Sequence, residues 1–437
     1  MKILLIILLV FSVSIIHAQE KDESGTYKKR VLESTEIDML LNYYQQDGEN
    51  AAVTGGKGTE ELQDVSSSLV IAIPLNDDDV LTINGNISAY TSASSSNIDP
   101  FDGSHPADPF VASSGASGND VWSNGIITFS HSSDDRNRVW SADASFSQEF
   151  DYVSLGFGGS YALLFNEKNT EVSLHGNVYI DSWKLIYPRE IRPFQQGGSG
   201  LNDLLFQRNE ITGNPDYNPQ FTEITDKGRN SYSAGLNFSQ VLSARMQGMI
   251  STDVILQNGL LSTPFHRVYF SDVEDSFIDN FHLADAIERL PDSRLKIAIG
   301  GRLNYFVNER ISVRTYYRYY FDDWGITSNT ASIELPIKIT DKFTIYPSYR
   351  YYNQTAADYF APYNEHLSSE KYYTSDYDLS KFNASNYGFG ISYTDIFTSG
   401  HIWKFGLKSI DFKYNNYSRN SAFKANMFSL GVKFVMD

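Results

Sequence analysis

Six basic side chains in the C-terminal half of the sequence alternate with apolar residues, so they are candidates for lining a polar passage. Between residues 294 and 304, Ile297 and Ile299 alternate with Lys296 and Arg302. Successive side chains of a β-strand point to opposite faces, so an apolar face in lipid places the basic face in a lumen. The predicted basic wall consists of Lys296, Arg302, Arg314, Arg318, Lys338 and Arg350.

The same alternation predicts an acidic side of the lumen on other strands. Its members are Glu36, Asp38, Asp143, Glu171 and Asp181. Opposed charges across a narrow lumen would create a transverse field that orients passing solutes. The alternative is that these side chains pair with one another and fill the interior, because buried charges are normally paired.

Three further carboxylates, those of Asp99, Asp102 and Asp108, lie within one ten-residue segment that also contains proline and glycine. Calcium takes six to eight oxygen ligands, so this segment is a candidate cation site, with a solvated loop as the alternative. No metal site is assigned with assurance from the sequence.

Catalytic chemistry has little support in the sequence. There is no cysteine, and the 8 histidines are scattered among expected loops and separate strands. The sequence lacks the Gly-x-Ser-x-Gly, His-Glu-x-x-His and Gly-x-x-x-x-Gly-Lys motifs. We therefore predict that the protein is not an enzyme and that it carries no cofactor.

The elements that position these residues are predicted to be β-strands of a transmembrane barrel. Two-residue alternation recurs at 332–340 and 428–434, without the three- and four-residue apolar spacing of a helix. The chain is hydrophilic on average, yet 14% of it is aromatic, as a barrel with one lipid face and one polar face requires. Aromatic clusters at 316–321 and 349–352 resemble an interfacial girdle, which disfavours a soluble β-sandwich or propeller.

The connections alternate in length between short polar turns and long loops. Short links occur at 76–79, 134–137, 166–169, 308–310 and 340–342, and long ones at 93–119, 185–229, 259–293 and 354–385. This asymmetry predicts an all-β, antiparallel, up-and-down barrel of about sixteen strands (fourteen to eighteen), with short periplasmic turns and long extracellular loops. An even number of strands places both termini in the periplasm, on the same side as the links at Asp134 and Asn308.

The N-terminus has the pattern of a secretory signal. Lys2 precedes an apolar run from Ile3 to Ile16, and His17-Ala18-Gln19 forms the cleavage zone. The predicted organisation is therefore a signal peptide at 1–18 and an outer-membrane barrel at 19–437. The formal charge of -18 disfavours nucleic acid as a partner. The expected partners are outer-membrane lipid and lipopolysaccharide, the barrel-assembly machinery during biogenesis and, in one alternative, an envelope protein.

One long loop, 259–293, is predicted to contain a short helix that controls access to the mouth. Phe281, Ala284, Ile287 and Leu290 have helical spacing, Asp279 or Asn280 can cap the helix, and Pro291 ends it. A short amphipathic helix needs a surface to pack against, and the loop 185–229 offers Phe194, Leu204, Leu205 and Phe206. The alternative is an exposed cap that leaves the pore unobstructed.

The N-terminal third contains five distinctive segments: 29–38 (KRVLESTEID), 46–56 (QDGENAAVTGG), 58–62 (GTEEL), 73–82 (IPLNDDDVLT) and 88–98 (SAYTSASSSNI). In these segments the chain resembles an outer-membrane family of Bacteroidota known as domain of unknown function 3570. The resemblance implies a barrel in the outer membrane and no established activity. It also suggests a connection with envelope redox biology, through flavin-transferring and thioredoxin-like proteins.

Two functions from different classes are consistent with the sequence. A barrel of about sixteen strands is wide enough to be a porin-like channel for small solutes or another transport component of the envelope. The alternative is a non-conducting barrel with a structural or partner-binding role, including that of a sleeve for a redox or flavin protein.

Overall fold

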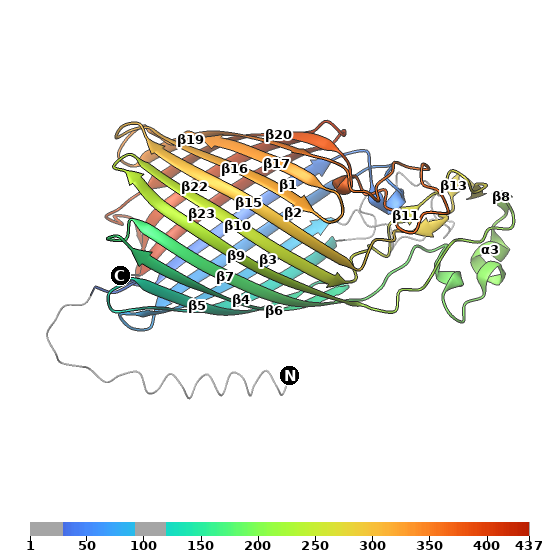
Figure 1. Ribbon diagram of the computed structural model, residues 1–437, viewed down its shortest axis with the longest axis horizontal. Coiled ribbons are helices and arrows are strands. Elements are labelled where there is room, and N and C mark those ends of the chain that lie inside the picture. Colours follow the sequence, from blue (N-terminus) through green and yellow to red (C-terminus); the bar gives the residue numbers. More distant parts are fainter. Residues whose placement is uncertain (1–28, 92–118, 437) are drawn as a thin grey trace, which may run out of the picture.

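A computed structural model describes residues 29–91 and 119–436. Figure 1 shows a closed barrel of tilted strands with a group of loops projecting from one end. The sheet contains sixteen long strands, and two strands of two residues each, β18 (Ile337–Lys338) and β21 (His401–Ile402), bring its total to 18. The long strands are β1 (Glu36–Asp47), β2 (Leu62–Pro74), β3 (Asp79–Thr91), β4 (Asn119–Ser132), β5 (Arg138–Gln148), β6 (Tyr152–Phe165), β7 (Thr170–Trp183), β9 (Gly228–Ser243), β10 (Met246–Gly259), β15 (Ser293–Phe306), β16 (Ser312–Asp322), β17 (Thr327–Glu334), β19 (Phe343–Gln354), β20 (Phe382–Thr394), β22 (Phe405–Arg419) and β23 (Lys424–Met436).

Each long strand pairs antiparallel with its neighbours in the chain, and the last strand closes the barrel on the first. The closing ladder between β1 and β23 runs from Glu36 opposite Val435 to Asp47 opposite Lys424. Closure leaves no sheet edge with unpaired backbone groups, which a lipid environment does not tolerate. The predicted all-β, antiparallel barrel of about sixteen strands is therefore confirmed.

The outer wall of the barrel is apolar. Large hydrophobic side chains at alternate positions remain exposed, for example Ile250 at 61% and Ile299 at 45%. Apolar surface on this scale is unfavourable in water and is removed from it by a surrounding bilayer. Among the helices in the described ranges, none has the length and apolar character needed to cross a membrane.

The two ends of the barrel differ. The start of β1, the end of β23 and the short links that contain Asp134 and Asn308 lie at one end, here called the turn end. At the opposite end, here called the loop end, long connections span 48–61, 184–227, 260–292 and 355–381. The predicted alternation of short and long connections is therefore observed, and the links at Asp134 and Asn308 lie at the same end as Glu36.

Within the described residues, the four long connections named above pack together into a unit that we call the cap. Its elements are η2 (Ala52–Thr54), η4 (Arg192–Phe194), η5 (Gly200–Asn202), α3 (Leu204–Arg208), β8 (Ile211–Gly213), β11 (Arg267–Val268), β12 (Ser276–Ile278), β13 (Phe281–His282), β14 (Ala286–Ile287) and η6 (Tyr377–Leu379). Apolar clusters join different loops: Leu205 and Phe206 pack with Ile278 and Phe281. The expected packing of loop 259–293 on loop 185–229 is thus present.

The helix predicted near 279–290 is wrong. Asp279 and Asn280 form the turn between β12 and β13, and Asp279 has a left-handed backbone with φ of 53°. The apolar spacing suggested a helix with one buried face, but the segment is buried on every side: Phe281, Leu283 and Ala284 are all fully enclosed. Neighbouring loops cover both faces of this segment, so its apolar residues need not gather on one face of a helix. Cap helix α3 lies instead in loop 184–227, where the Asp203 carboxylate accepts a hydrogen bond from the backbone N–H of Leu205.

Candidate functional site

The register of the sheet places the six residues of the predicted basic wall on one face of four strand segments, β15, β16, β18 and β19. Residues directly opposite each other in antiparallel strands share a face. One such row contains Arg302, Tyr316, Ser332 and Arg350. The next row toward the loop end places Arg318 opposite Thr330. Arg350 also lines a pocket inside the barrel together with side chains of β1, β22 and β23, which establishes its face as the lumen.

The members of the basic wall differ in their partners. Arg314 forms an ion pair of 2.9 Å with Glu334, and Lys296 lies opposite Asp322, whose carboxylate binds Arg294 at 2.5 Å. Lys338, in β18, lies at the turn end and is exposed.

Three arginines of the lumen have no acidic partner in the described residues. Arg302 lies over the ring of Tyr316 at 5.4 Å, and Arg350 makes no hydrogen bond or ion pair within the described ranges. The Nε of Arg318 is buried without a hydrogen-bond acceptor, and so is the hydroxyl of the opposite Thr330. Arg302, Arg318 and Arg350, which we call the arginine triad, thus present positive charge to the lumen.

The predicted acidic residues are spread over β1, β5 and β7, and three of the five are paired with neighbouring strands. Lys433 contacts Glu36 at 2.7 Å and Asp38 at 3.1 Å. Asp181 binds Arg229 at 2.7 Å. In the part of the chain that the structure describes, the other two, Asp143 and Glu171, have no basic partner. Among the described residues, ion pairs therefore involve three of the five predicted acidic residues but one of the six residues of the basic wall.

A pocket of about 810 Å³ lies inside the barrel at the loop end. Tyr352 and Tyr417 contribute aromatic walls, and Asp378 of the cap reaches into it. Arg419 binds Asp378 at 2.6 Å and lies over the rings of Phe382 and Phe423 at 4.5 and 4.4 Å. The cap thus contributes directly to the mouth of the lumen.

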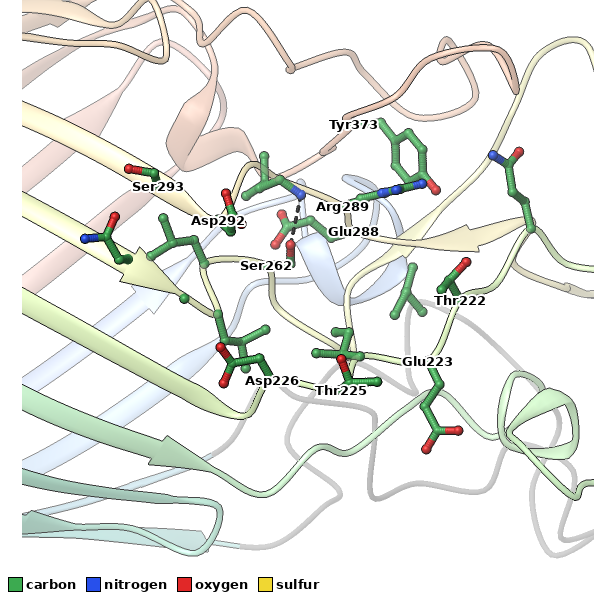
Figure 2. Close-up of a pocket in the computed structure, with 18 residues that line it drawn as sticks. Thr222, Glu223, Thr225, Asp226, Ser262, Glu288, Arg289, Asp292, Ser293 and Tyr373 are labelled. Carbon is green, nitrogen blue, oxygen red and sulfur yellow. Dashed lines mark hydrogen bonds between the residues drawn. The ribbon is translucent and has the colours of Figure 1, made fainter.

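A second cavity, of about 540 Å³, lies between the loops where the cap meets β10 and β15, and Figure 2 shows its lining. Four carboxylates, those of Glu223, Asp226, Glu288 and Asp292, line it against one guanidinium, that of Arg289. The lining is therefore acidic.

The cap contains a fully buried ion pair. Arg267 and Glu190 are 1% and 0% exposed. The guanidinium meets both carboxylate oxygens, with Nε to Oε1 at 2.7 Å and Nη2 to Oε2 at 3.2 Å. Nη1 of Arg267 donates to the carbonyl of Val53 at 3.0 Å, so one side chain joins three loops.

Beside the acidic cavity, His266, Glu288 and Asp376 bring three ligand-type atoms within 4.8 Å of one another. Burial raises the pKa of Asp376 to about 7, and the charges of Asp378 and Glu288 act in the same direction. Burial opposes the protonation of His266, but the facing carboxylate of Glu288 outweighs it and raises the pKa of the imidazole. Two carboxylates and one imidazole therefore share a confined space.

Sequence reasoning missed the residues that make up these cap sites. Arg419 could have been found, because Ile410, Phe412 and Tyr414 mark the outward face of β22 and leave its odd-numbered residues inward. The partners of Arg267 and His266 are far away in the sequence and lie in loops without periodicity, so no local signal identifies them. The predicted signal peptide at 1–18 and the carboxylates Asp99, Asp102 and Asp108 lie outside the described residues.

A closed barrel of sixteen long strands with an apolar outer wall and a charged interior defines the class as an outer-membrane-type β-barrel. Residues 107–427 match the family model described as "Protein of unknown function (DUF3570)", and the chain belongs to this family. The match begins downstream of the N-terminal segments that carried the resemblance. The assignment to Bacteroidota stays a prediction.

Several solved structures resemble this barrel at low identity. "Bacterial polysaccharide outer membrane secretin" is 9% identical, with coverage of 92% of this chain and 98% of that chain and a TM-score of 0.42. A BenF-like porin from Pseudomonas fluorescens Pf-5 is 8% identical, with coverage of 93% and 100% and a TM-score of 0.40. OpdQ from Pseudomonas aeruginosa is 8% identical, with coverage of 92% and 98% and a TM-score of 0.39. The likeness concerns the fold alone. No curated protein matches the sequence.

Proposed function

We propose that this protein is an outer-membrane channel for small solutes and that its lumen favours anions. The observation that carries the proposal is the arginine triad, whose positive charges face the lumen without acidic partners among the described residues. Fixed charges on a pore wall attract counter-ions and repel ions of their own sign. Basic partners offset the acidic residues Glu36, Asp38 and Asp181, so these oppose the field only weakly. Asp143 and Glu171, without a basic partner among the described residues, are the acidic residues that oppose it.

Planar-bilayer recording with the purified protein tests the proposal. We expect discrete conductance steps and, in a KCl gradient, a reversal potential that indicates selectivity for chloride. Arg318→Gln and Arg350→Gln should each reduce this selectivity. Arg245→Gln provides the matched control, because Arg245 is exposed in the turn between β9 and β10. A folded protein without conductance, or selectivity for potassium, would contradict the proposal.

The cap supports a role in controlling access, because Asp378 and Arg419 connect it with the mouth of the lumen. If the cap narrows the passage, Glu190→Ala, which disturbs the buried pair of the cap, should increase single-channel conductance. Unchanged conductance in a folded variant would favour a cap that leaves the pore unobstructed.

The orientation that we propose has the turn end in the periplasm and the cap outside the cell. The chain contains no cysteine, so single introduced cysteines can be labelled selectively in intact cells. We expect Asp135→Cys and Glu309→Cys to stay unmodified, and Glu274→Cys in the cap to react. Strong labelling at 135 and 309 would invert the orientation.

A non-conducting barrel that binds a partner is the second candidate. The observation in its favour is the cap itself, a folded unit beyond the barrel that is held together by clusters of enclosed apolar side chains. Absence of conductance in a correctly folded protein would favour this function.

A further inference from the structure

The hairpin of β11 and β14 holds His266 and Glu288 opposite each other. Arg267 pairs with Ile287, and the ladder continues with a hydrogen bond of 2.9 Å from the N–H of Glu288 to the carbonyl of His266. Opposite residues share a face of a hairpin, and here Nδ1 of His266 lies 3.5 Å from Oε1 of Glu288. Backbone pairing therefore places the two side chains next to each other.

The third member, Asp376, comes from loop 355–381, which is joined to the hairpin by a backbone bridge. Arg289 and Tyr373 exchange two backbone hydrogen bonds, of 3.1 and 2.7 Å. The hydroxyl of Thr374 then donates to Oε1 of Glu288 at 2.5 Å and accepts from the N–H of Asp376 at 3.0 Å. One threonine thus orients both acidic residues.

The three donor atoms lie within 4.8 Å of one another, and one of their separations matches the edge of a coordination tetrahedron. Nδ1 of His266 is enclosed and faces Oε1 of Glu288 at 3.5 Å, without a hydrogen bond of good geometry in the described residues. The edge of a tetrahedron with metal–ligand bonds of about 2.1 Å measures about 3.4 Å, close to the 3.5 Å between Nδ1 and Oε1. The backbone N–H of Thr263 donates to the other oxygen of Glu288 at 2.6 Å, an outer hydrogen bond of the kind that orients ligating carboxylates.

The acidic cavity of Figure 2 gives a cation a route to this cluster. Glu288 belongs both to the cluster and to the cavity wall, where Glu223, Asp226 and Asp292 add negative charge. Imidazole with carboxylates suits Zn²⁺ and related transition metals, whereas Ca²⁺ prefers oxygen ligands alone.

We propose that His266, Glu288 and Asp376 form a binding site for one divalent transition-metal cation, Zn²⁺ by donor preference, which fastens the β11/β14 hairpin to loop 355–381. Three protein ligands leave one tetrahedral position for water. The site lies in the cap and does not depend on whether the barrel conducts.

Isothermal titration of the full-length, chelator-treated protein with Zn²⁺ tests this site. We expect one zinc per chain, and affinity at least ~100-fold lower for His266→Gln and for Asp376→Asn, since losing a ligand costs more than losing an outer-shell partner. The control variants are His282→Gln, a histidine of the cap outside the cluster, and Glu223→Gln, a carboxylate on the cavity wall. Both controls should retain the zinc.

Two readouts on the unaltered protein keep the test valid if a variant misfolds. Zinc should slow protease cleavage within the cap, and removal of the zinc by a chelator should restore the original rate of cleavage. Co²⁺ in place of zinc should show the visible absorption of a four-coordinate site. No binding at micromolar zinc, or binding of equal strength in His266→Gln and Asp376→Asn, would overturn the proposal.

Discussion

The barrel wall contains hydrated ion pairs beside partly buried ones such as Asp181–Arg229, whereas the central ion pair of the cap is removed from solvent entirely. In the wall, ion pairs such as Arg314–Glu334 connect neighbouring strands and remain open to the lumen, where the Arg314 side chain is 58% exposed. In the cap, Arg267 and Glu190 are removed from solvent together and meet through two contacts. Charge in the wall can therefore act on passing ions, whereas charge in the cap holds loops together. A single chain thus combines a hydrated, charge-lined interior with a unit packed like a small soluble domain.

The largest expected effect comes from breaking the buried pair of the cap. Glu190→Ala leaves the guanidinium of Arg267 buried without its carboxylate, which costs about 3–5 kcal/mol. The cap should open locally while the barrel remains folded, and hydrogen exchange of cap amides measures this. The corresponding change in the wall, Glu334→Ala, should cost no more than about 1 kcal/mol because the pair is hydrated. Equal costs at the two sites would remove the contrast between cap and wall.

A smaller effect is expected from adding charge to the outer face of the wall. Ile299 lies near the middle of β15 and points outward, so Ile299→Arg should cost about 2–4 kcal/mol in a bilayer. The adjacent Ala298 points inward, and Ala298→Arg should be tolerated much better. Denaturant unfolding in lipid vesicles compares the two variants. A similar loss for both would mean that the lumen is as dry as the lipid face.

The smallest of the three effects concerns pH. Burial raises the pKa of Asp285 in the cap to about 6, from a usual 3.8. The folded cap therefore binds this proton more tightly than the unfolded chain. The contribution of this bound proton to the stability of the cap is fully present below pH 4 and is lost as the pH rises through 6. This loss lowers the free energy of unfolding by up to about 3 kcal/mol.

Asp285→Asn should remove this pH dependence, because the amide cannot ionise and keeps an oxygen to accept the 2.8 Å hydrogen bond from the N–H of Phe270. Exchange of the Phe270 amide at pH 5 and pH 8 measures the difference. Wild type should exchange faster at pH 8 beyond the intrinsic change in rate, and the variant should not. Parallel behaviour of the two proteins would contradict the assignment.

The contrast between wall and cap also explains which predictions succeeded. Strands that separate lipid from a polar lumen must alternate between apolar and polar residues. A short stretch of sequence is therefore enough to recognise a strand of the wall. Ile297 and Ile299 alternate with Lys296 and Arg302, and this suffices to predict strand, face and neighbouring turn. The loop 259–293 has no such constraint, and its apolar spacing at Phe281 and Ala284 fitted a helix that the structure replaces with a β-hairpin.

The sequence by itself determined the closed antiparallel barrel, its approximate strand number and the alternation of short and long connections, because each follows from the two-residue period and the turn residues. Only the tertiary structure decided which charges are paired and which loops meet. Asp181 could have faced the lumen alone, but Arg229 of the adjacent strand lies 2.7 Å away. Glu190 and Arg267, separated by 77 residues, become partners only when two loops enclose them. Contacts between loops depend on packing across the whole cap, and no periodicity in the chain encodes them.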